Sequence, residues 1–293
     1  MYERIAAESK FSIHRLRITL PKGASIPNDK SVTVASTELQ DGDTIQVKDL
    51  GMPQAPRDDN QTLTNNTRPG PQIAWRTVFI IEYLGPLLIH PLIYYLRPYI
   101  YTLPAFDAGP STLQTLSLAM IVLHFLKREL ETLFVHRFSL ATMPFLNVFK
   151  NSAHYWLFSG VLIAYFTYSP TSPTAEPNPN PLLTYAAIAL YIFGELANLS
   201  THLSLRSLRR PGSTERGVPR GLGFGVVTCP NYTFESLAWV AILTVNRHWS
   251  TALFIAIAVG QMAVWAKKKE RRYRKELGGK YKAKKYAMVP GIW

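Results

Sequence analysis

The stretch from Leu253 to Val264, "LFIAIAVGQMAV", decides the fold of this chain, because its single polar residue is Gln261. A helix that is apolar on every side has no face to turn toward water, so it belongs inside a protein or in a lipid bilayer. The stretch lies in a longer apolar run, 249–266, whose length is close to the roughly 20 residues that cross a bilayer core. It therefore predicts a membrane-spanning helix.

Five further apolar runs precede this one and are separated by short loops. The candidate spans are 73–96, 112–126, 153–168, 182–204, 232–246 and 249–266. A soluble helical bundle is the weaker alternative, because soluble helices keep a polar face. We therefore expect a mostly α protein, a polytopic membrane helix bundle of about six spans.

Basic residues predict the orientation of these spans. They gather in the loops 127–150 and 205–220 and in the tail after Ala266, and the Pro-rich connector 169–181 carries one charge. Because loops rich in Lys and Arg stay in the cytosol, both termini are predicted to be cytosolic. The same loops account for most of the net charge of +13, so we expect membrane lipid and no nucleic acid as a partner.

The chain divides by composition into three parts. Residues 1–50 alternate apolar and polar positions and contain a turn signal at Asp41-Gly42-Asp43, which predicts a small β-rich module. Residues 51–71 are polar and rich in Pro, Gly and Asn, and they indicate a flexible linker. Residues 72–293 form the membrane domain. A cleavable signal peptide is not expected, because "MYERIAAESK" has no apolar core.

Polar residues share one face of the fourth candidate span. Positions three or four apart meet on the same side of a helix. The members of this stripe are Glu195, Asn198, His202, Arg206 and Arg209. Ionisable groups at membrane depth usually serve a function, so the stripe favours the wall of a polar cavity. The alternative is a hydrogen-bonded seam between helices.

Two other spans direct cationic groups to the same membrane level. The second span ends with His124, Lys127, Arg128 and Glu131 on one side, and the last span carries Lys269 and Tyr273 as it leaves the membrane. Arg and Lys bind phosphate by charge and hydrogen bonds, which favours a ligand with several phosphates. Attraction to anionic lipid headgroups is the alternative for the tail. The histidines are scattered over different segments, so no metal is expected.

The stretch "TCPNYTFE", 228–235, opens the fifth span with polar residues. Pro230 suits a first helical turn, and Asn231, Tyr232 and Glu235 lie on or beside one face. A buried phenol near a cofactor can donate a proton. Tyr is also a common anchor at the membrane surface, and the spacing alone does not separate these two interpretations.

Several segments together resemble a known family. They are "KRELETLFVHRFSLATMPFLNVFKNSAHYW" (127–156), "LRRPG" (208–212), "CPNYTFE" (229–235), "WAKKKERRYRKELGGKYKAKKYAMVPGIW" (265–293), "DGDTIQVKDLG" (41–51) and "PQIAWRTVFIIEYLGP" (71–86). They resemble the trans-2-enoyl-CoA reductases of very-long-chain fatty acid elongation, within the steroid 5α-reductase superfamily. The sequence departs from the family in two ways: residues 51–70 are inserted, and the N-terminal ubiquitin-like module is only partial.

The resemblance implies a multi-pass enzyme of the endoplasmic reticulum membrane that uses NADPH. Such an enzyme adds hydride to C3 and a proton to C2 of a long-chain trans-2-enoyl-CoA, as the last step of the elongation cycle. Other fatty acid elongation enzymes are the partners that the family implies. A further role in sphingolipid breakdown is associated with it.

The resemblance also implies roles for individual residues. Tyr232 matches the catalytic tyrosine and Glu82 an acidic residue of the first span. The steroid reductases carry a tyrosine where this chain has Phe125, which strengthens the case for Tyr232. The positions at or beside the cofactor are Arg128, Arg137, Asn198, His202, Arg209, Asn231, Glu235, Lys269 and Tyr273.

Three alternatives remain open at this point. The nearest is a steroid or other lipid-alkene reductase of the same superfamily, which the loss of the tyrosine at Phe125 disfavours. The second is a membrane methyltransferase that uses S-adenosylmethionine, which the segment 127–156 disfavours. The third is a non-catalytic scaffold of an elongation complex, in which the polar stripe only packs helices.

Overall fold

The computed structural model describes residues 16–19, 25–26, 44–49, 71–101, 109–138, 142–178, 180–208 and 217–292. The chain divides into two compact units, 1–67 and 68–293. In the first unit the strands β1 (Leu16–Thr19), β2 (Ser25–Ile26) and β3 (Gln46–Asp49) form an antiparallel sheet in the order β2-β1-β3. Of the expected linker 51–71, all but Pro71 lies outside the described residues.

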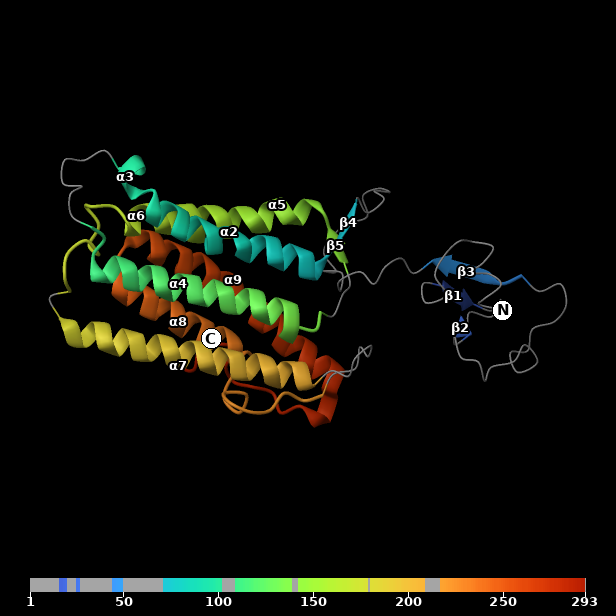
Figure 1. The fold of residues 1–293 in the computed structure, drawn as a ribbon. Helices are drawn as coiled ribbons and strands as arrows, with labels where there is room; N and C mark the ends of the chain where they lie inside the picture. The colour runs from blue at the N-terminus through green and yellow to red at the C-terminus, as the bar shows by residue number, and fades with distance from the viewer. Residues whose placement is uncertain are drawn as a thin grey trace. The chain divides into compact units, whose positions relative to one another are not determined.

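The second unit is a bundle of long helices (Figure 1). Its helices are α2 (Trp75–Tyr95), α3 (Arg97–Ile100), α4 (Thr112–Leu130), η4 (Glu131–Val135), α5 (Leu146–Ala153), η5 (His154–Leu162), α6 (Ile163–Thr167), α7 (Pro181–Ser207), α8 (Pro230–Asn246), α9 (Trp249–Leu277) and η6 (Gly278–Lys280). The short strands β4 (Gln72–Ala74) and β5 (Thr142–Pro144) pair antiparallel. Figure 1 shows these strands at one end of the bundle, with α3 and α6 toward the other.

Three helices in the described part of the chain are long and apolar enough to cross a membrane: α2, α7 and the helix from Trp249 to Lys280. Their outward residues are large and apolar, as in Leu88, Ile192 and Ile257, which suits a lipid environment. The prediction of a mostly helical membrane protein is confirmed by the helical fold and by these three candidate membrane helices. The number of spans stays a prediction.

Local sequence explains where the helices begin. Ser111 and Gln114 form a capping box at the start of α4, in which each side chain bonds the other residue's backbone N–H. Asn180 caps α7 in front of Pro181. Pro230 opens α8, where a missing N–H costs nothing. The later part of α4 lies beside the first turns of α8, where His124 contacts Glu235.

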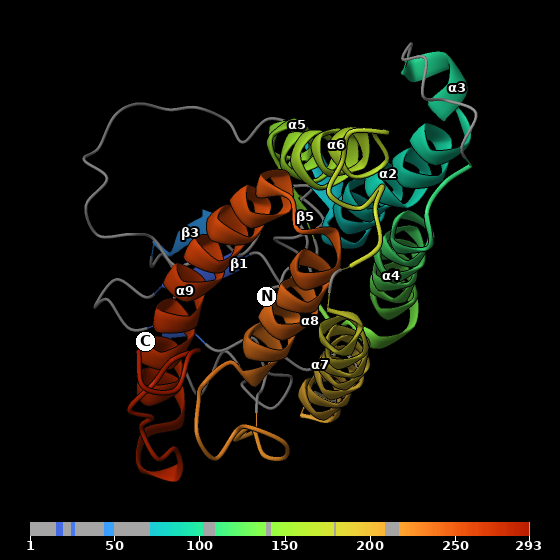
Figure 2. The same ribbon diagram turned by 90° about the vertical axis from the view of Figure 1, so that its left-hand side faces the viewer.

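The packing of α7 against α8 is close and depends on Gly194. A Cβ added at Gly194 would lie 2.9 Å from the backbone nitrogen of Ala238 and 3.0 Å from the carbonyl oxygen of Phe234. Glycine therefore lets the two backbones approach closely. Figure 2 shows α7 beside α8, with α4 and α9 flanking the pair. Aromatic side chains such as Phe125 and Trp239 fill the core between these helices.

Candidate active site

The polar stripes of α4, α7 and α8 face one another at the end of the bundle where α4 ends and α8 begins. His124 of α4 lies between two carboxylates, with its Nδ1 2.6 Å from Oε1 of Glu195 and its Nε2 3.3 Å from Oε1 of Glu235. Only 2% of His124 is exposed. A charged group at such depth needs partners, and the three helices supply them to one another.

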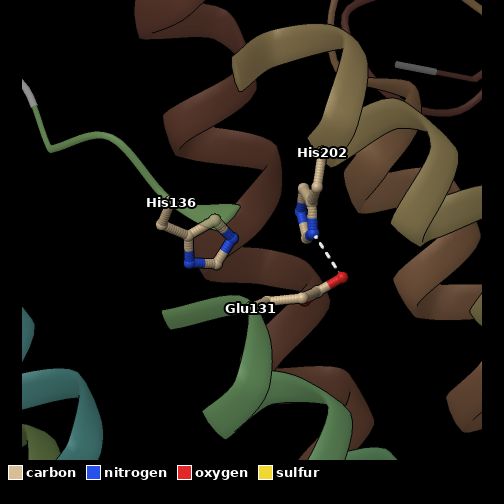
Figure 3. Close-up of side chains that lie close together, drawn as sticks. All are labelled: Glu131, His136 and His202. Carbon is tan, nitrogen blue, oxygen red and sulfur yellow. Dashed lines mark ion pairs between the residues drawn. The ribbon is translucent and has the colours of Figure 1, made fainter. Parts of the chain in front are cut away.

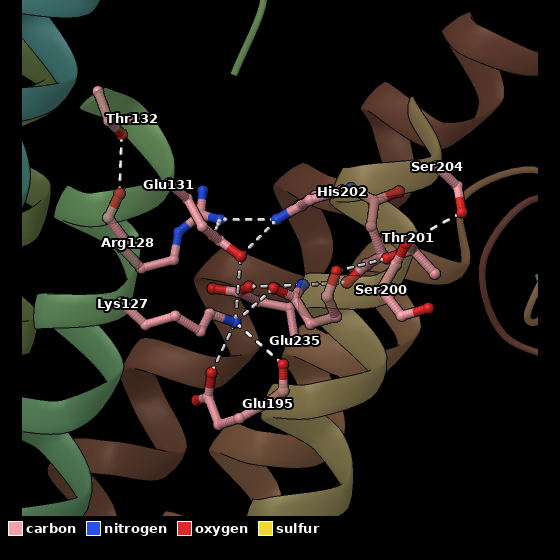
Figure 4. Close-up of polar contacts among 12 residues, drawn as sticks. Lys127, Arg128, Glu131, Thr132, Glu195, Ser200, Thr201, His202, Ser204 and Glu235 are labelled. Atoms are coloured by element: carbon pink, nitrogen blue, oxygen red, sulfur yellow. Dashed lines mark hydrogen bonds and ion pairs between the residues drawn. The ribbon is translucent and has the colours of Figure 1, made fainter. Parts of the chain in front are cut away.

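Lys127, which Figure 4 shows beside Glu195, extends this network together with Asn198. The Nζ of Lys127 lies 2.7 Å from Oε2 of Glu195 and donates to Oδ1 of Asn198 at 2.6 Å. The amide of Asn198 donates in turn to Oε2 of Glu235 at 3.0 Å and to the carbonyl oxygen of Asn231 at 2.9 Å. The predicted cofactor residues Asn198, Asn231 and Glu235 are therefore brought together.

Arg128 joins the network to α2 and to the His202 side of α7. Its Nη1 bonds Oε2 of Glu131 at 2.7 Å, and its Nη2 donates to the hydroxyl of Tyr83 at 2.9 Å. Glu131 also lies 3.0 Å from Nδ1 of His202. Arg128 and His202 thus lie in the cluster, but the Arg128 guanidinium is already paired with a carboxylate and a phenol.

Tyr232, Lys269 and Tyr273 form a second group, between α8 and α9. The Nζ of Lys269 lies 5.3 Å from the centre of the Tyr232 ring, within cation–π distance. Tyr273 is buried, and its ring contacts that of Tyr281 in a tilted arrangement with the ring centres 5.4 Å apart. Tyr232 directly follows Asn231 on α8, so the second group adjoins the ionic network through the chain itself.

The remaining predicted residues lie in different places. Glu82 of α2 is 2% exposed and accepts a hydrogen bond from Asn151, while its Oε1 has no hydrogen-bond partner among the described residues. Arg137 donates to the carbonyl oxygen of Arg206 at 3.3 Å. Arg209 lies outside the described residues. Glu82 is thus a third buried polar location, separate from the ionic network and from the Tyr232 group, and it lies on the helix that carries Tyr83.

Among the residues that the structure describes, a cluster with metal-binding side chains is assembled, although its histidines are scattered in sequence. The ligand atoms of Glu131, His136 and His202 lie within 4.8 Å of one another, and Figure 3 shows the three side chains converging. However, Arg128 and Lys127 lie 2.7 Å and 3.6 Å from the carboxylate of Glu131. A divalent cation would face two fixed positive charges there, so we assign no metal to this cluster.

His136 follows η4 and lies outside the candidate spans. Burial, together with the charges of Arg128 and His202, lowers the pKa of His136 to about 3, against a smaller opposing effect of Glu131. The imidazole is therefore neutral at physiological pH. A neutral ring lets His136 pack against His202, at 4.9 Å between ring centres, without adding a further positive charge.

The predicted site did not include several residues that the structure places in it. His124, Lys127, Glu131 and Glu195 were visible in the polar stripes, but spacing within one helix does not say which helix faces it. Tyr83 gave no separate signal, because a tyrosine in an apolar helix is ordinary. Its contact with Arg128 depends on how α2 and α4 pack.

Fold and site together define a membrane-embedded helical bundle with a buried ionic network and a neighbouring phenol. Residues 141–293 match the model of the family described as 3-oxo-5-alpha-steroid 4-dehydrogenase. The chain belongs to this family.

Relatives extend the similarity to nearly the whole chain. A Dictyostelium discoideum protein named very-long-chain enoyl-CoA reductase is 36% identical over 98% of this chain and 89% of its own length. A Schizosaccharomyces pombe protein provisionally named an enoyl reductase is 40% identical over 98% of this chain and 88% of its own length. A Caenorhabditis elegans protein, named a probable very-long-chain enoyl-CoA reductase, is 39% identical over 93% of this chain and 82% of its own length.

Proposed function

We propose that this chain reduces long-chain trans-2-enoyl-CoA to saturated acyl-CoA with NADPH, as the last step of very-long-chain fatty acid elongation. The observation that carries the proposal is the similarity, over 98% of the chain, to a relative named very-long-chain enoyl-CoA reductase. An oxidoreductase acting on a carbon–carbon double bond is also in keeping with the steroid 4-dehydrogenase family.

Tyr232 is the residue that we propose as proton donor. Its ring lies under the ammonium group of Lys269, and its helix begins beside the ionic network of Asn198 and Glu235. Reduction of an enoyl thioester leaves negative charge on the thioester oxygen and C2. A positioned phenol lowers the barrier by supplying the proton, and a nearby fixed cation stabilises the developing charge.

Unpaired polar atoms in the site suit a nicotinamide cofactor. Within the described part of the chain, Oδ1 of Asn231 and Oε1 of Glu82 are buried without hydrogen-bond partners, and such atoms can accept from an amide or a hydroxyl. When bound, NADPH supplies the hydride for C3. The proposed cofactor residues are Arg128, Arg137, Asn198, His202, Arg209, Asn231, Glu235, Lys269 and Tyr273.

The ion pairs refine this assignment. Since Lys127 and Arg128 are paired with Glu195 and Glu131, we propose that they organise the site rather than neutralise phosphates.

We further propose an endoplasmic reticulum location, six spans with both termini cytosolic, and a partial ubiquitin-like N-terminal module. The basic loops support the orientation, and the sheet β2-β1-β3 is in keeping with a β-rich module. Other fatty acid elongation enzymes are the proposed partners. A role in sphingolipid breakdown would use the same reaction on a different enoyl-CoA.

The test is turnover of the purified protein with NADPH and a long-chain trans-2-enoyl-CoA, following NADPH oxidation and the saturated product. Tyr232→Phe should lower kcat by roughly a hundredfold or more, the scale of general-acid catalysis. Tyr185→Phe is the matched control, because Tyr185 is 69% exposed on α7, and it should retain full activity.

The possible outcomes separate the alternatives. Turnover that survives Tyr232→Phe would refute the role of the phenol but keep the reductase. NADPH binding without turnover of the enoyl-CoA would favour a steroid or another lipid alkene as substrate. A protein that binds S-adenosylmethionine instead would refute the reductase proposal altogether.

A further inference from the structure

Glu270, on the part of α9 that follows its apolar stretch, accepts four hydrogen bonds from three segments of the chain. Its Oε2 accepts from the hydroxyls of Thr228 and Tyr281, both at 2.5 Å. Its Oε1 accepts from Nε of Arg274 at 2.8 Å and from the backbone nitrogen of Lys284 at 3.0 Å. The residue is 7% exposed. These four donors match the roughly four lone-pair sites of a carboxylate.

Two of these donors belong to the segment 281–289, which we call the C-terminal strap. The strap also bonds the start of α8 through its backbone. The carbonyl oxygen of Ala287 accepts from the N–H of Cys229 at 2.9 Å, and that of Met288 accepts from the hydroxyl of Thr233 at 2.6 Å. The side chain of the N-cap residue Cys229 makes no capping hydrogen bond in the described structure, but the strap satisfies the backbone N–H of this residue at the helix start.

The strap and α9 also contact the partly buried side chain of Tyr232. Cys229, Ala266, Ala287 and Met288 form a small buried cluster, and Tyr232 packs against it. Lys269, which precedes Glu270 on α9, lies over the Tyr232 ring. The position of the phenol therefore depends on the strap, on α9 and on the first turn of α8.

We propose that Glu270 is a positioning residue for the reduction: it fastens the C-terminal strap to the start of α8 and so holds Tyr232 in place. The inference rests on the proposed function, because it takes Tyr232 as the proton donor. The part of the proposal in which Glu270 fastens the strap rests on the hydrogen bonds alone, and it can be tested without substrate.

Cys229 provides the first test, because it is the only cysteine of the chain and is 1% exposed beneath the strap. A thiol reacts when its cover opens locally. In the intact protein in detergent, Glu270→Ala should raise the rate of Cys229 modification by a small maleimide by roughly tenfold or more, given the strength of hydrogen bonds to a charged group. Glu270→Gln should give a smaller increase.

Glu276→Gln is the matched control for this experiment. Glu276 lies on the same helix, pairs with Arg272 one turn away at 2.5 Å and is 40% exposed at its side chain. Its replacement should leave the labelling rate within about twofold, since exposed pairs contribute little. A labelling rate that stays at the wild-type value in both Glu270 variants would overturn the proposal.

The second test asks whether Glu270 acts through Tyr232. Glu270→Gln should lower kcat roughly tenfold and leave KM for the enoyl-CoA within about twofold, as expected for a loss realised in the chemical step. Added to Tyr232→Phe, it should lower kcat little further, because the two changes remove one function. A full tenfold loss in that background would overturn the positioning role. Wild-type protein that does not turn over would refute the proposed function, while Cys229 labelling would still decide whether Glu270 docks the strap.

Discussion

At the scale of single residues, the ionic network around Lys127 is the feature that most constrains the site. Three carboxylates, Glu131, Glu195 and Glu235, lie within reach of Lys127, Arg128 and His124. Buried ions of this kind stabilise a fold only as a complete set, because removal of one partner leaves another charge unpaired. The network thus fixes the relative positions of α4, α7 and α8.

Lys127→Met tests this dependence. It should lower the free energy of unfolding by about 3–5 kcal/mol, because Glu195 loses a cation 2.7 Å away at a buried position. Denaturant unfolding in detergent, followed by tryptophan fluorescence, measures the change. Arg272→Met is the control, since it breaks the exposed pair with Glu276 and should cost no more than about 1 kcal/mol. Equal losses in both variants would contradict the network's role.

His136 makes the stability of the fold depend on pH. Burial, with Arg128 and His202, lowers the pKa of His136 from 6.5 to about 3 in the folded protein. Between these values the unfolded chain binds more protons, so this contribution is complete above pH 6.5 and is lost as the pH falls toward 3. His136→Gln should therefore show a smaller drop in melting temperature between pH 7.5 and pH 5 than the wild type. An unchanged pH profile in the variant would contradict the assignment.

At the scale of elements, the sequence predicts which residues share a face of one helix, but it does not predict which helix packs against that face. The stripe of Glu195, Asn198 and His202 follows from helical periodicity, and the structure places all three in one network. The contact between Lys127 and Glu195 could not be predicted, because it requires the rotation and separation of two helices. The role of Glu270 could not be predicted for a similar reason. A carboxylate within a run of cations indicates ion pairs along its own helix, and it does not indicate hydrogen bonds to distant segments of the chain.

Gly194 controls the separation of α7 and α8. Gly194→Ala should force the helices apart, because the new Cβ would lie 2.9 Å from the Ala238 nitrogen. We expect a loss of about 1–3 kcal/mol in the free energy of unfolding, and a fall in activity as Asn198 moves away from Glu235. Gly260→Ala on α9 is the control: in the described structure nothing lies within 4 Å of its added Cβ, so stability should hold or rise. An equally destabilised control would show that glycine flexibility, not helix approach, matters.

At the scale of the whole molecule, apolar length predicted a helical membrane protein, while the exact helix bounds required the structure. The predicted third span, 153–168, starts inside a continuous helical rod that runs from Leu146 through η5 to Thr167. The amphipathic first part of this rod has no hydropathy signal of its own. The hydrogen bonds that the C-terminal strap makes to the start of α8 join residues more than 50 positions apart, and local propensity cannot predict them.

Orientation in the membrane is the prediction that belongs to the whole molecule. Basic residues stay in the cytosol, so the tail after Ala266 should be cytosolic. Three predicted spans separate that tail from the connector 169–181, which should therefore lie on the opposite side. Single cysteines at two exposed positions, Thr171→Cys and Lys282→Cys, report each side in a Cys229→Ala background.

In sealed microsomes, a membrane-impermeant maleimide should label the cysteine at 282 at once and the cysteine at 171 only after permeabilisation. The difference should be close to complete, because an impermeant reagent reads sidedness as an all-or-none property. Equal labelling at both positions in sealed vesicles would require an even number of crossings between them. The fourth, fifth and sixth spans could then not all cross, and at least one of the helices α7, α8 and α9 would not span the membrane.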